Sequence, residues 1–316
     1  MSDYVDPLIQ PMDLAAVLRL TKDLRASARL LAPKEARFLV DEYYSRQEDR
    51  IRSSNQSKAL EKANEPNLLV TWLSEQNEVL EKQIASVLDR YSLSQPVGEW
   101  MRSITGIGPV IAAGILAHID IEQCPTAGHL WSFAGLVSTI TWQKETKRPW
   151  NAKLKTLCWK LGESFVKVSN LEHDVYGKIY AARKVLENQR NIKGDYITTA
   201  AEQLIKRKYS KDTDAYLWYT GALAPNAIAV LAVTAAAARP AMLKRLVAEA
   251  AKKGTGQPML PPAHIHARAK RYAVKLFLSH LHEVWYTLHF GVAPAPPYAI
   301  AVLKHAHYIP PPNFQK

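Results

Sequence analysis

The sequence is poor in cysteine and has no clear secretory or membrane segment. Its 316 residues contain only Cys124 and Cys158, whose separation fits neither a metal site nor a disulfide framework. The first residues are acidic and polar where a secretory signal carries a basic region. The longest apolar run, residues 222–238, is interrupted by Pro225 and Asn226 and is expected to be a buried helix. These shortages exclude a disulfide scaffold and a membrane protein, and favour a reducing cytoplasm.

Residues 1–95 also lack the alternating pattern of β-strands. Apolar residues instead recur every three or four positions after Pro33, and again from Pro66 to Tyr91. The polar segment Ser53–Ser57 is expected to form a loop between these patterns. Two amphipathic stretches with charged outer faces are typical of a helical hairpin or a coiled-coil-like arm. We therefore expect a homo-oligomer.

Glycine is scarce, and two of the 13 glycines stand in the stretch Thr105-Gly106-Ile107-Gly108-Pro109. Helical patterns precede and follow it, which is typical of a helix-hairpin-helix. Such a turn can point backbone N–H groups at a phosphate, beside the positive end of the next helix. We therefore predict nucleic-acid contacts at Thr105, Gly106, Ile107 and Gly108. The alternative is a turn whose glycines only allow close helix packing.

Positive charge is concentrated in three windows. Residues 1–100 carry 13 Lys and Arg against 16 Asp and Glu. Residues 141–160, 178–211 and 244–275 carry 6 against 1, 9 against 3 and 8 against 1, in a chain of net charge +12. Charge gathered in this way favours a polyanion partner over a merely soluble surface. DNA is the partner we expect, with RNA and branched DNA left open.

Within the first window, tryptophans alternate with cations, an arrangement that suits stacking on bases and neutralising phosphates. The residues predicted to bind nucleic acid there are Trp142, Lys144, Lys147, Arg148, Lys153 and Lys155. Trp150 lies among them. The competing interpretation is core packing for the tryptophans and a solvated loop for the cations. A later basic helix adds Arg268, Lys270 and Arg271 as predicted contacts.

Two segments together resemble a known family. The stretch Ile104–Ala113, followed by His129–Val137 with its Ala-Gly-Leu, resembles the C-terminal domain of the bridge-RNA-type insertion-sequence transposases. A basic helix at Lys153–Gly162 and the basic–aromatic stretch His264–Tyr286 extend the likeness, which covers roughly residues 96–180 and 262–298. The resemblance implies a transposase-like protein of a mobile element or phage.

The sequence departs from this family in the residues that cut DNA. The resemblance implies an RNase-H-like domain with four acidic metal ligands, yet residues 1–95 show no strands. It also implies a serine nucleophile shortly after Ala-Gly-Leu, where this chain has Thr141-Trp142-Gln143. Ser138, Thr139 and Thr141 are poor substitutes without an activating partner. We therefore predict no catalytic residue.

Histidines are the remaining candidates for chemistry, because most of the ten follow residue 263. These are His264, His266, His280, His282, His289, His305 and His307. Pairs two residues apart do not share a helix face, and only His264/His266 and His305/His307, if extended, could chelate from one side. Polar helix faces and nucleic-acid contacts are the competing roles, and we predict no metal site. No cofactor is predicted either.

The expected fold is mostly α: a helical N-terminal arm, then a helix-hairpin-helix domain with an inserted helical subdomain. The expected segments are residues 1–95, 96–180, 181–262 and 263–316, the last comprising a closing basic helix and a proline-rich tail. The favoured function is transposase-like DNA binding without cleavage. The alternatives are an active transposase or recombinase with a separate catalytic subunit or an unrecognised nucleophile, and a self-assembling structural protein.

Overall fold

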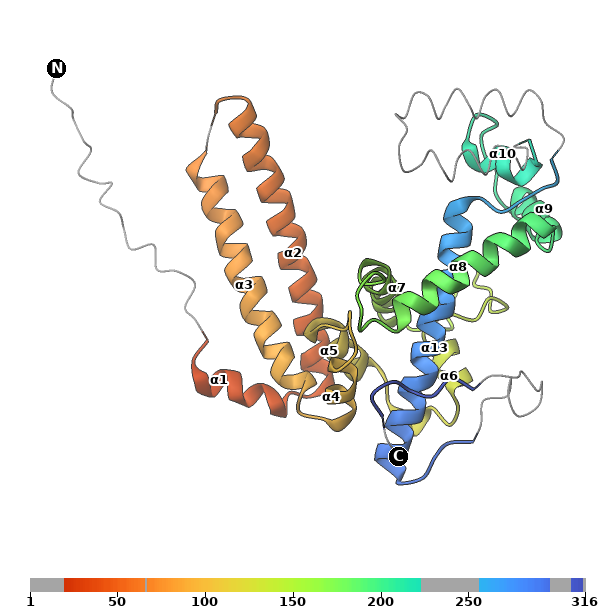
Figure 1. Cartoon of the computed structure of the whole chain (residues 1–316). Coiled ribbons are helices and arrows are strands. Elements are labelled where there is room, and N and C mark those ends of the chain that lie inside the picture. The colour runs from red at the N-terminus through yellow and green to blue at the C-terminus, as the bar shows by residue number, and fades with distance from the viewer. Residues whose placement is uncertain (1–19, 66, 223–255, 296–307, 315–316) are drawn as a thin grey trace, which may run out of the picture. The chain divides into compact units, whose positions relative to one another are not determined.

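The computed structural model describes residues 20–65, 67–222, 256–295 and 308–314. Within these ranges every regular element is a helix, so the expected mostly α fold is confirmed. The chain divides into two compact units, residues 1–164 with 277–316 and residues 165–276. Figure 1 shows the helices along the chain. No helix of the described ranges is long and apolar enough to span a membrane.

The first unit begins with a helical arm. After α1 (Lys22–Ser27) and a 3-10 turn, η1 (Ala28–Leu30), the helices α2 (Pro33–Lys62) and α3 (Leu68–Ser92) form an antiparallel hairpin (Figure 1). Glu81 of α3 is 8% exposed, and it accepts from Arg50 Nε at 2.6 Å and Gln47 Nε2 at 3.0 Å of α2. Burial raises the pKa of Glu81, but these donors outweigh burial and lower it. The hairpin is therefore fixed by a satisfied polar contact as well as by apolar packing.

The loop expected at Ser53–Ser57 is wrong, because α2 continues through it to Lys62. The Ser53 hydroxyl donates to the Asp49 carbonyl at 2.7 Å, so its hydrogen bond is made within the helix and does not compete with it. Ser57 Oγ lies 3.2 Å from Thr71 Oγ1 of α3. Pairing with α3 thus overrides the weak helix propensity of this polar segment.

Short helices follow the arm within the first unit: α4 (Pro96–Arg102), α5 (Pro109–His118), η2 (Ile121–Gln123), α6 (Ala127–Phe133) and most of α7 (Ala152–Lys167). The small residues Ala112 and Ala113 of α5 are fully buried. A Cβ added at Gly114 would meet Leu157 Cδ1 of α7 at 2.7 Å and Val40 Cγ1 of α2 at 3.5 Å. Small side chains on α5 therefore let neighbouring helices approach it closely.

The later part of α13 (Pro262–Phe290) also belongs to the first unit. The rings of Phe277 and Trp100 stack at 5.9 Å between centroids. Trp100 Nε1 donates to the Pro312 carbonyl at 2.8 Å, so residues near the C-terminus return to α4. Asn313 Nδ2 donates to the Ser103 carbonyl at 3.1 Å beside it. These bonds hold the helix that precedes the glycine turn.

The second unit contains α8 (Tyr176–Lys193), α9 (Ile197–Lys206), α10 (Asp214–Thr220) and the first part of α13. One buried apolar cluster of this unit comprises Tyr196, Ala200, Tyr219, Leu260 and Ile265. A compact unit is not necessarily a domain, because a domain folds on its own. The division of the chain into the four expected segments therefore stays a prediction. Residues 223–238 of the apolar run, His305 and His307 lie outside the described residues.

Candidate nucleic-acid interface

The glycine turn is a fixed structure between α4 and α5. Gly106 adopts φ +93°, in the left-handed region that favours glycine. Its carbonyl accepts from Ser164 Oγ of α7 at 2.5 Å. The next carbonyl, of Ile107, accepts from Arg102 Nη1 at 3.0 Å, and Arg102 is held in turn by Asp89 at 2.8 Å. Two side chains from the neighbouring helices thus fix the carbonyls of Gly106 and Ile107.

Gly108 differs from the other glycines of this region. It caps α5 with φ −86° and ψ 173°, a conformation open to any residue, and Pro109 follows at the first helical position. A Cβ added at Gly108 would meet nothing within 4 Å. At Gly98 the added Cβ would lie 1.8 Å from the Ser92 carbonyl oxygen. Close packing therefore explains the glycines at 98 and 114, but not the glycine at 108.

The other two predicted residues of the turn contribute differently. Ile107 is 3% exposed, and its N–H donates to the Ile104 carbonyl at 3.1 Å. Both its side chain and its backbone groups are therefore used inside the chain. Thr105 is half-buried. Gly106 and Gly108 are partly exposed like Thr105, so these three residues form the accessible part of the turn.

The segment that follows α6 presents its predicted cations to solvent. Lys144, Lys147 and Arg148 are all exposed. The Arg148 guanidinium lies 5.1 Å from the centre of the Trp142 ring, and Trp142 Nε1 donates to the Thr146 carbonyl at 2.7 Å. The ring and its cation are thus held at the surface together.

Two further predicted lysines lie on α7. Lys155 Nζ is 4.1 Å from the centre of the Trp150 ring. Lys153 Nζ lies 3.2 Å from Asp41 Oδ1, with both side chains largely exposed. An exposed pair of this kind is worth little and exchanges readily for a phosphate. The structure brings Trp142, Arg148, Trp150 and Lys155 around one groove.

Trp159 also lines this groove, and sequence reasoning did not place it in the site. Trp159 lies on α7 and is 60% exposed. Leu154, Leu157 and Leu161 of the same helix are buried. Their three- and four-residue spacing was the available signal, because it places Trp159 on the opposite, outer face together with Lys155.

Asn151 anchors the start of α7. Its Oδ1 accepts from the Leu154 N–H at 3.0 Å, as an N-cap does, and its N–H donates to the Phe133 carbonyl at 2.9 Å. Its Nδ2 therefore donates to His118 Nδ1, 3.2 Å away. Burial, together with Arg37, lowers the pKa of His118 to about 4. The neutral ring is thus the form that accepts this bond.

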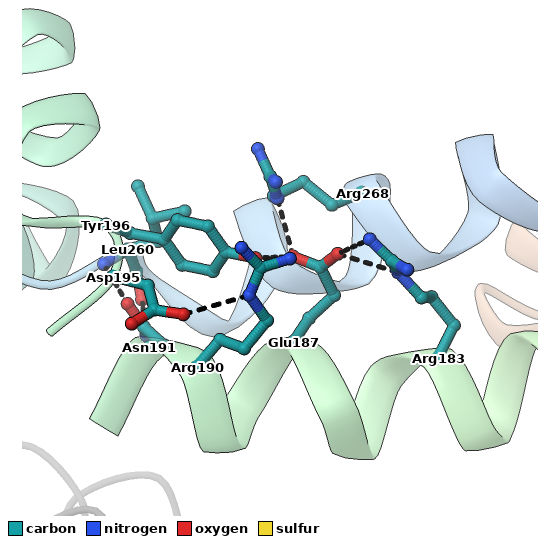
Figure 2. Close-up of polar contacts among 8 residues, drawn as sticks. All are labelled: Arg183, Glu187, Arg190, Asn191, Asp195, Tyr196, Leu260 and Arg268. Carbon is teal, nitrogen blue, oxygen red and sulfur yellow. Dashed lines mark hydrogen bonds and ion pairs between the residues drawn. The ribbon is translucent and has the colours of Figure 1, made fainter. Parts of the chain in front are cut away.

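The second unit uses its arginines internally. Glu187 is 1% exposed and accepts from Arg183 Nε at 2.7 Å, Arg268 Nε at 2.7 Å and the Tyr196 hydroxyl at 2.5 Å (Figure 2). Burial raises the pKa of Glu187, but the Tyr196 hydrogen bond and the two guanidiniums outweigh it and lower the pKa. Arg268, a predicted nucleic-acid contact, is thus also part of an internal ion pair.

The same cluster continues toward the end of α8. Arg190 Nε donates to Asp195 Oδ2 at 3.0 Å, and Asn191 Nδ2 donates to the Leu260 carbonyl at 2.9 Å (Figure 2). On α13, Lys270 is half-buried and Arg271 is exposed. Of the three cations predicted on this helix, Arg271 is thus the most accessible.

The histidines are hydrogen-bonded to separate parts of the chain. His280 Nε2 lies 2.8 Å from the Ile309 carbonyl oxygen, and His282 Nε2 lies 2.8 Å from that of Cys124. His264 and His266 contact the hydroxyls of Tyr219 and Tyr180. Across the described ranges, no three His, Cys, Asp or Glu side chains gather as metal ligands. Ser138, Thr139 and Thr141 are exposed or near the surface in the segment after Gly135.

Comparison with protein families places a match on the glycine turn. Residues 98–141 match the model of the transposase IS116/IS110/IS902 family. The match includes α5, α6 and the segment up to the first threonines of the tryptophan region. The resemblance to insertion-sequence transposases is therefore confirmed over this stretch. Neither the comparison with curated proteins nor that with solved structures found a match.

Proposed function

We propose that this chain is a transposase-like nucleic-acid-binding protein of a mobile element or phage. It grips the phosphate backbone of DNA at the turn 105–108, and its exposed cations extend the contact. This binding takes place in the cytoplasm of a prokaryotic cell or on its nucleoid. Cleavage of the strand is not part of this activity.

The open space over Gly108 is the observation that carries this proposal. The fold makes no demand for glycine there, since the backbone is ordinary and an added Cβ meets nothing. A glycine at the start of a helix lets a phosphate approach the first backbone N–H groups without a side chain between them. The α5 helix, with ten residues, adds the positive end of its dipole to the same place.

The exposed cations provide the second support. Lys144, Lys147 and Arg148 extend into solvent within the same unit as the turn. Cations that bind phosphates release the counterions condensed on the DNA. The logarithm of the affinity should therefore fall linearly with the logarithm of the salt concentration. A salt titration of DNA binding therefore tests the electrostatic part of the proposal.

Substitution of Gly108 tests the turn itself. Gly108→Ala should leave the unfolding midpoint nearly unchanged, and Gly108→Asp should reduce DNA affinity strongly because its charge repels the phosphate. Gly128 of α6 is exposed and makes only ordinary contacts, so Gly128→Asp is the matched control. Equal DNA affinity of wild type, Gly108→Asp and Gly128→Asp would disprove phosphate binding at the turn. Nicking of supercoiled DNA by the wild type with Mg²⁺ would show that the chain also cuts.

We further propose that the α2–α3 arm mediates self-association. Leu68, Leu69 and Leu73 are 85%, 76% and 47% exposed at the start of α3. Exposed leucines on one end of an amphipathic hairpin favour burial against a second copy. Sedimentation should show an oligomer that Leu69→Glu with Leu73→Glu dissociates. A monomeric wild type at micromolar concentration would rule out this role.

A further inference from the structure

The groove between the end of the 142–150 segment and α7 carries three tryptophans and two cations. Trp142, Arg148, Trp150, Lys155, Thr156 and Trp159 line a groove of about 420 Å³. All of these residues belong to the first unit. A fold normally buries such rings, because each one offers a large apolar surface. Here Trp159 is 60% exposed and Trp142 38% exposed.

Local structure holds the rings in place. Trp150 approaches the chain closely at Gly135, where an added Cβ would lie 2.7 Å from Trp150 Cγ. Trp142 is fixed by its hydrogen bond to the Thr146 carbonyl, and Trp159 by the helix whose other face is buried. The groove is therefore formed before any ligand arrives, which lowers the entropy cost of binding.

The cations restrict what the groove can bind. Arg148 and Lys155 lie against the rings of Trp142 and Trp150, at 5.1 and 4.1 Å from their centres. A cationic ligand such as a quaternary ammonium would be repelled by these two charges, although bare aromatic rings attract it. An anionic ligand with flat apolar parts is attracted by both. A nucleic-acid strand is such a ligand, because it alternates phosphates with planar bases.

We propose that this groove binds an unpaired base of a nucleic-acid strand, with Trp159 as its stacking platform. The inference rests on the proposed nucleic-acid binding and names the form of strand that is preferred. In a duplex the faces of the bases are covered by their neighbours, and only edges and phosphates are presented. An exposed tryptophan face can therefore stack only on a base that has left the stack. The groove gives the protein a preference for single-stranded or locally opened nucleic acid.

The test compares a base-bearing single strand with an abasic strand and with a duplex. The full chain is titrated with a single-stranded oligothymidylate, with an oligomer of equal length whose central bases are absent, and with a duplex. Each is prepared as DNA and as RNA. Trp159→Ala should weaken binding to the base-bearing single strand on the order of tenfold. The affinity of the Trp159→Ala variant for the abasic strand and for the duplex should equal that of the wild type. Trp159→Phe should retain most of the wild-type affinity for the base-bearing strand.

Trp72 of α3, 39% exposed, is the matched control, because Trp72→Ala removes a surface tryptophan far along the sequence from the groove. The inference would be overturned if Trp159→Ala weakened binding to base-bearing and abasic strands equally. It would also be overturned if Trp159→Ala weakened binding in neither the DNA series nor the RNA series. In that case salt-dependent binding by the wild type would leave the proposed function standing. Failure of the wild type to bind every oligomer would instead defeat the proposed function, and the inference with it.

Discussion

Two basic regions of the chain look alike in sequence and differ in structure. Residues 141–160 of the first unit carry exposed cations beside exposed aromatic rings. In the second unit, Arg183 and Arg268 instead converge on the buried carboxylate of Glu187 (Figure 2). A local excess of Lys and Arg therefore does not measure the charge available to a polyanion. One buried carboxylate can commit two arginines to the fold.

The largest effect expected from this comparison is on stability. Glu187→Ala removes the shared acceptor and leaves two guanidiniums facing each other beside Tyr196, so it should lower the free energy of unfolding by about 3–5 kcal/mol. Urea denaturation followed by circular dichroism measures this. Glu202→Ala, which removes an exposed carboxylate 3.8 Å from Lys206, is the control and should cost at most about 1 kcal/mol. Equal costs for the two variants would contradict the structural role of Glu187.

The pH dependence of the same carboxylate follows from its lowered pKa. The unfolded chain takes up a proton at Glu187 near its ordinary pKa of 4.5, whereas the folded chain does so only at a lower pH. The stabilisation by Glu187 is therefore complete above pH 4.5 and is lost as the pH falls through the folded value. The cost of Glu187→Ala should thus shrink in acid. An unchanged cost in acid would show that the carboxylate is not ionised in the folded chain.

The next effect concerns affinity in the first unit. Lys147→Glu with Arg148→Glu should weaken DNA binding by an order of magnitude or more at low salt, and should reduce the slope of log affinity against log salt by about two. Filter binding over a salt series measures both. Lys58→Glu with Lys62→Glu introduces the same charge change on the exposed side of α2. If both double variants lose affinity equally, net charge and not this segment governs binding.

Arg268 tests whether an arginine used in the fold of the second unit also contacts nucleic acid. Arg268→Gln removes one of two guanidiniums from Glu187 and should destabilise the second unit by about 1–3 kcal/mol while leaving the salt slope unchanged. Arg271→Gln, on the exposed side of the same helix, should have little effect on stability. A salt slope lowered by about one in Arg268→Gln would show that Arg268 serves nucleic acid as well as the fold.

The smallest effect is a loss of stability in mild acid. Since the pKa of His118 is lowered to about 4, the unfolded chain binds a proton below pH 6.5 that the folded chain refuses until about pH 4. Stability should therefore decline as the pH falls from 6.5 to about 4, because proton uptake at His118 favours the unfolded chain. His118→Gln should reduce the decline. Identical pH profiles for wild type and His118→Gln would remove this explanation.

The helices near the glycine turn were predictable because local signals agree there. Pro96 and Pro109 mark the starts of α4 and α5, and α7 and α13 fall on the basic stretches that the family resemblance indicated. The Ser53–Ser57 segment failed the same reasoning, since its helix depends on a partner helix that local propensity does not describe. Tertiary contact decides such polar stretches.

The contacts that hold the predicted binding residues within the fold could not be predicted from the sequence. Sequence alone could not separate Gly106, which the turn requires, from Gly108, which it does not. Nor could it reveal that Arg268 meets Glu187, because the two are far apart along the chain and only folding brings them together. The surface position of Trp159 was predictable, since the buried leucines of its helix define the opposite face. Buried partners of charged groups are the information that sequence patterns lack.

The bond from Ser164 to the Gly106 carbonyl links the two proposed contacts with a nucleic-acid strand. It ties the glycine turn to α7, the helix that also carries Trp159, so a rigid spacer joins the two proposed contacts. A strand held at the turn then meets the tryptophan groove at a fixed effective concentration, set by helix geometry and not by loop motion. The losses caused by Gly108→Asp and Trp159→Ala should therefore combine differently on long and short oligomers. Only an oligomer long enough to reach both contacts gains from their linkage.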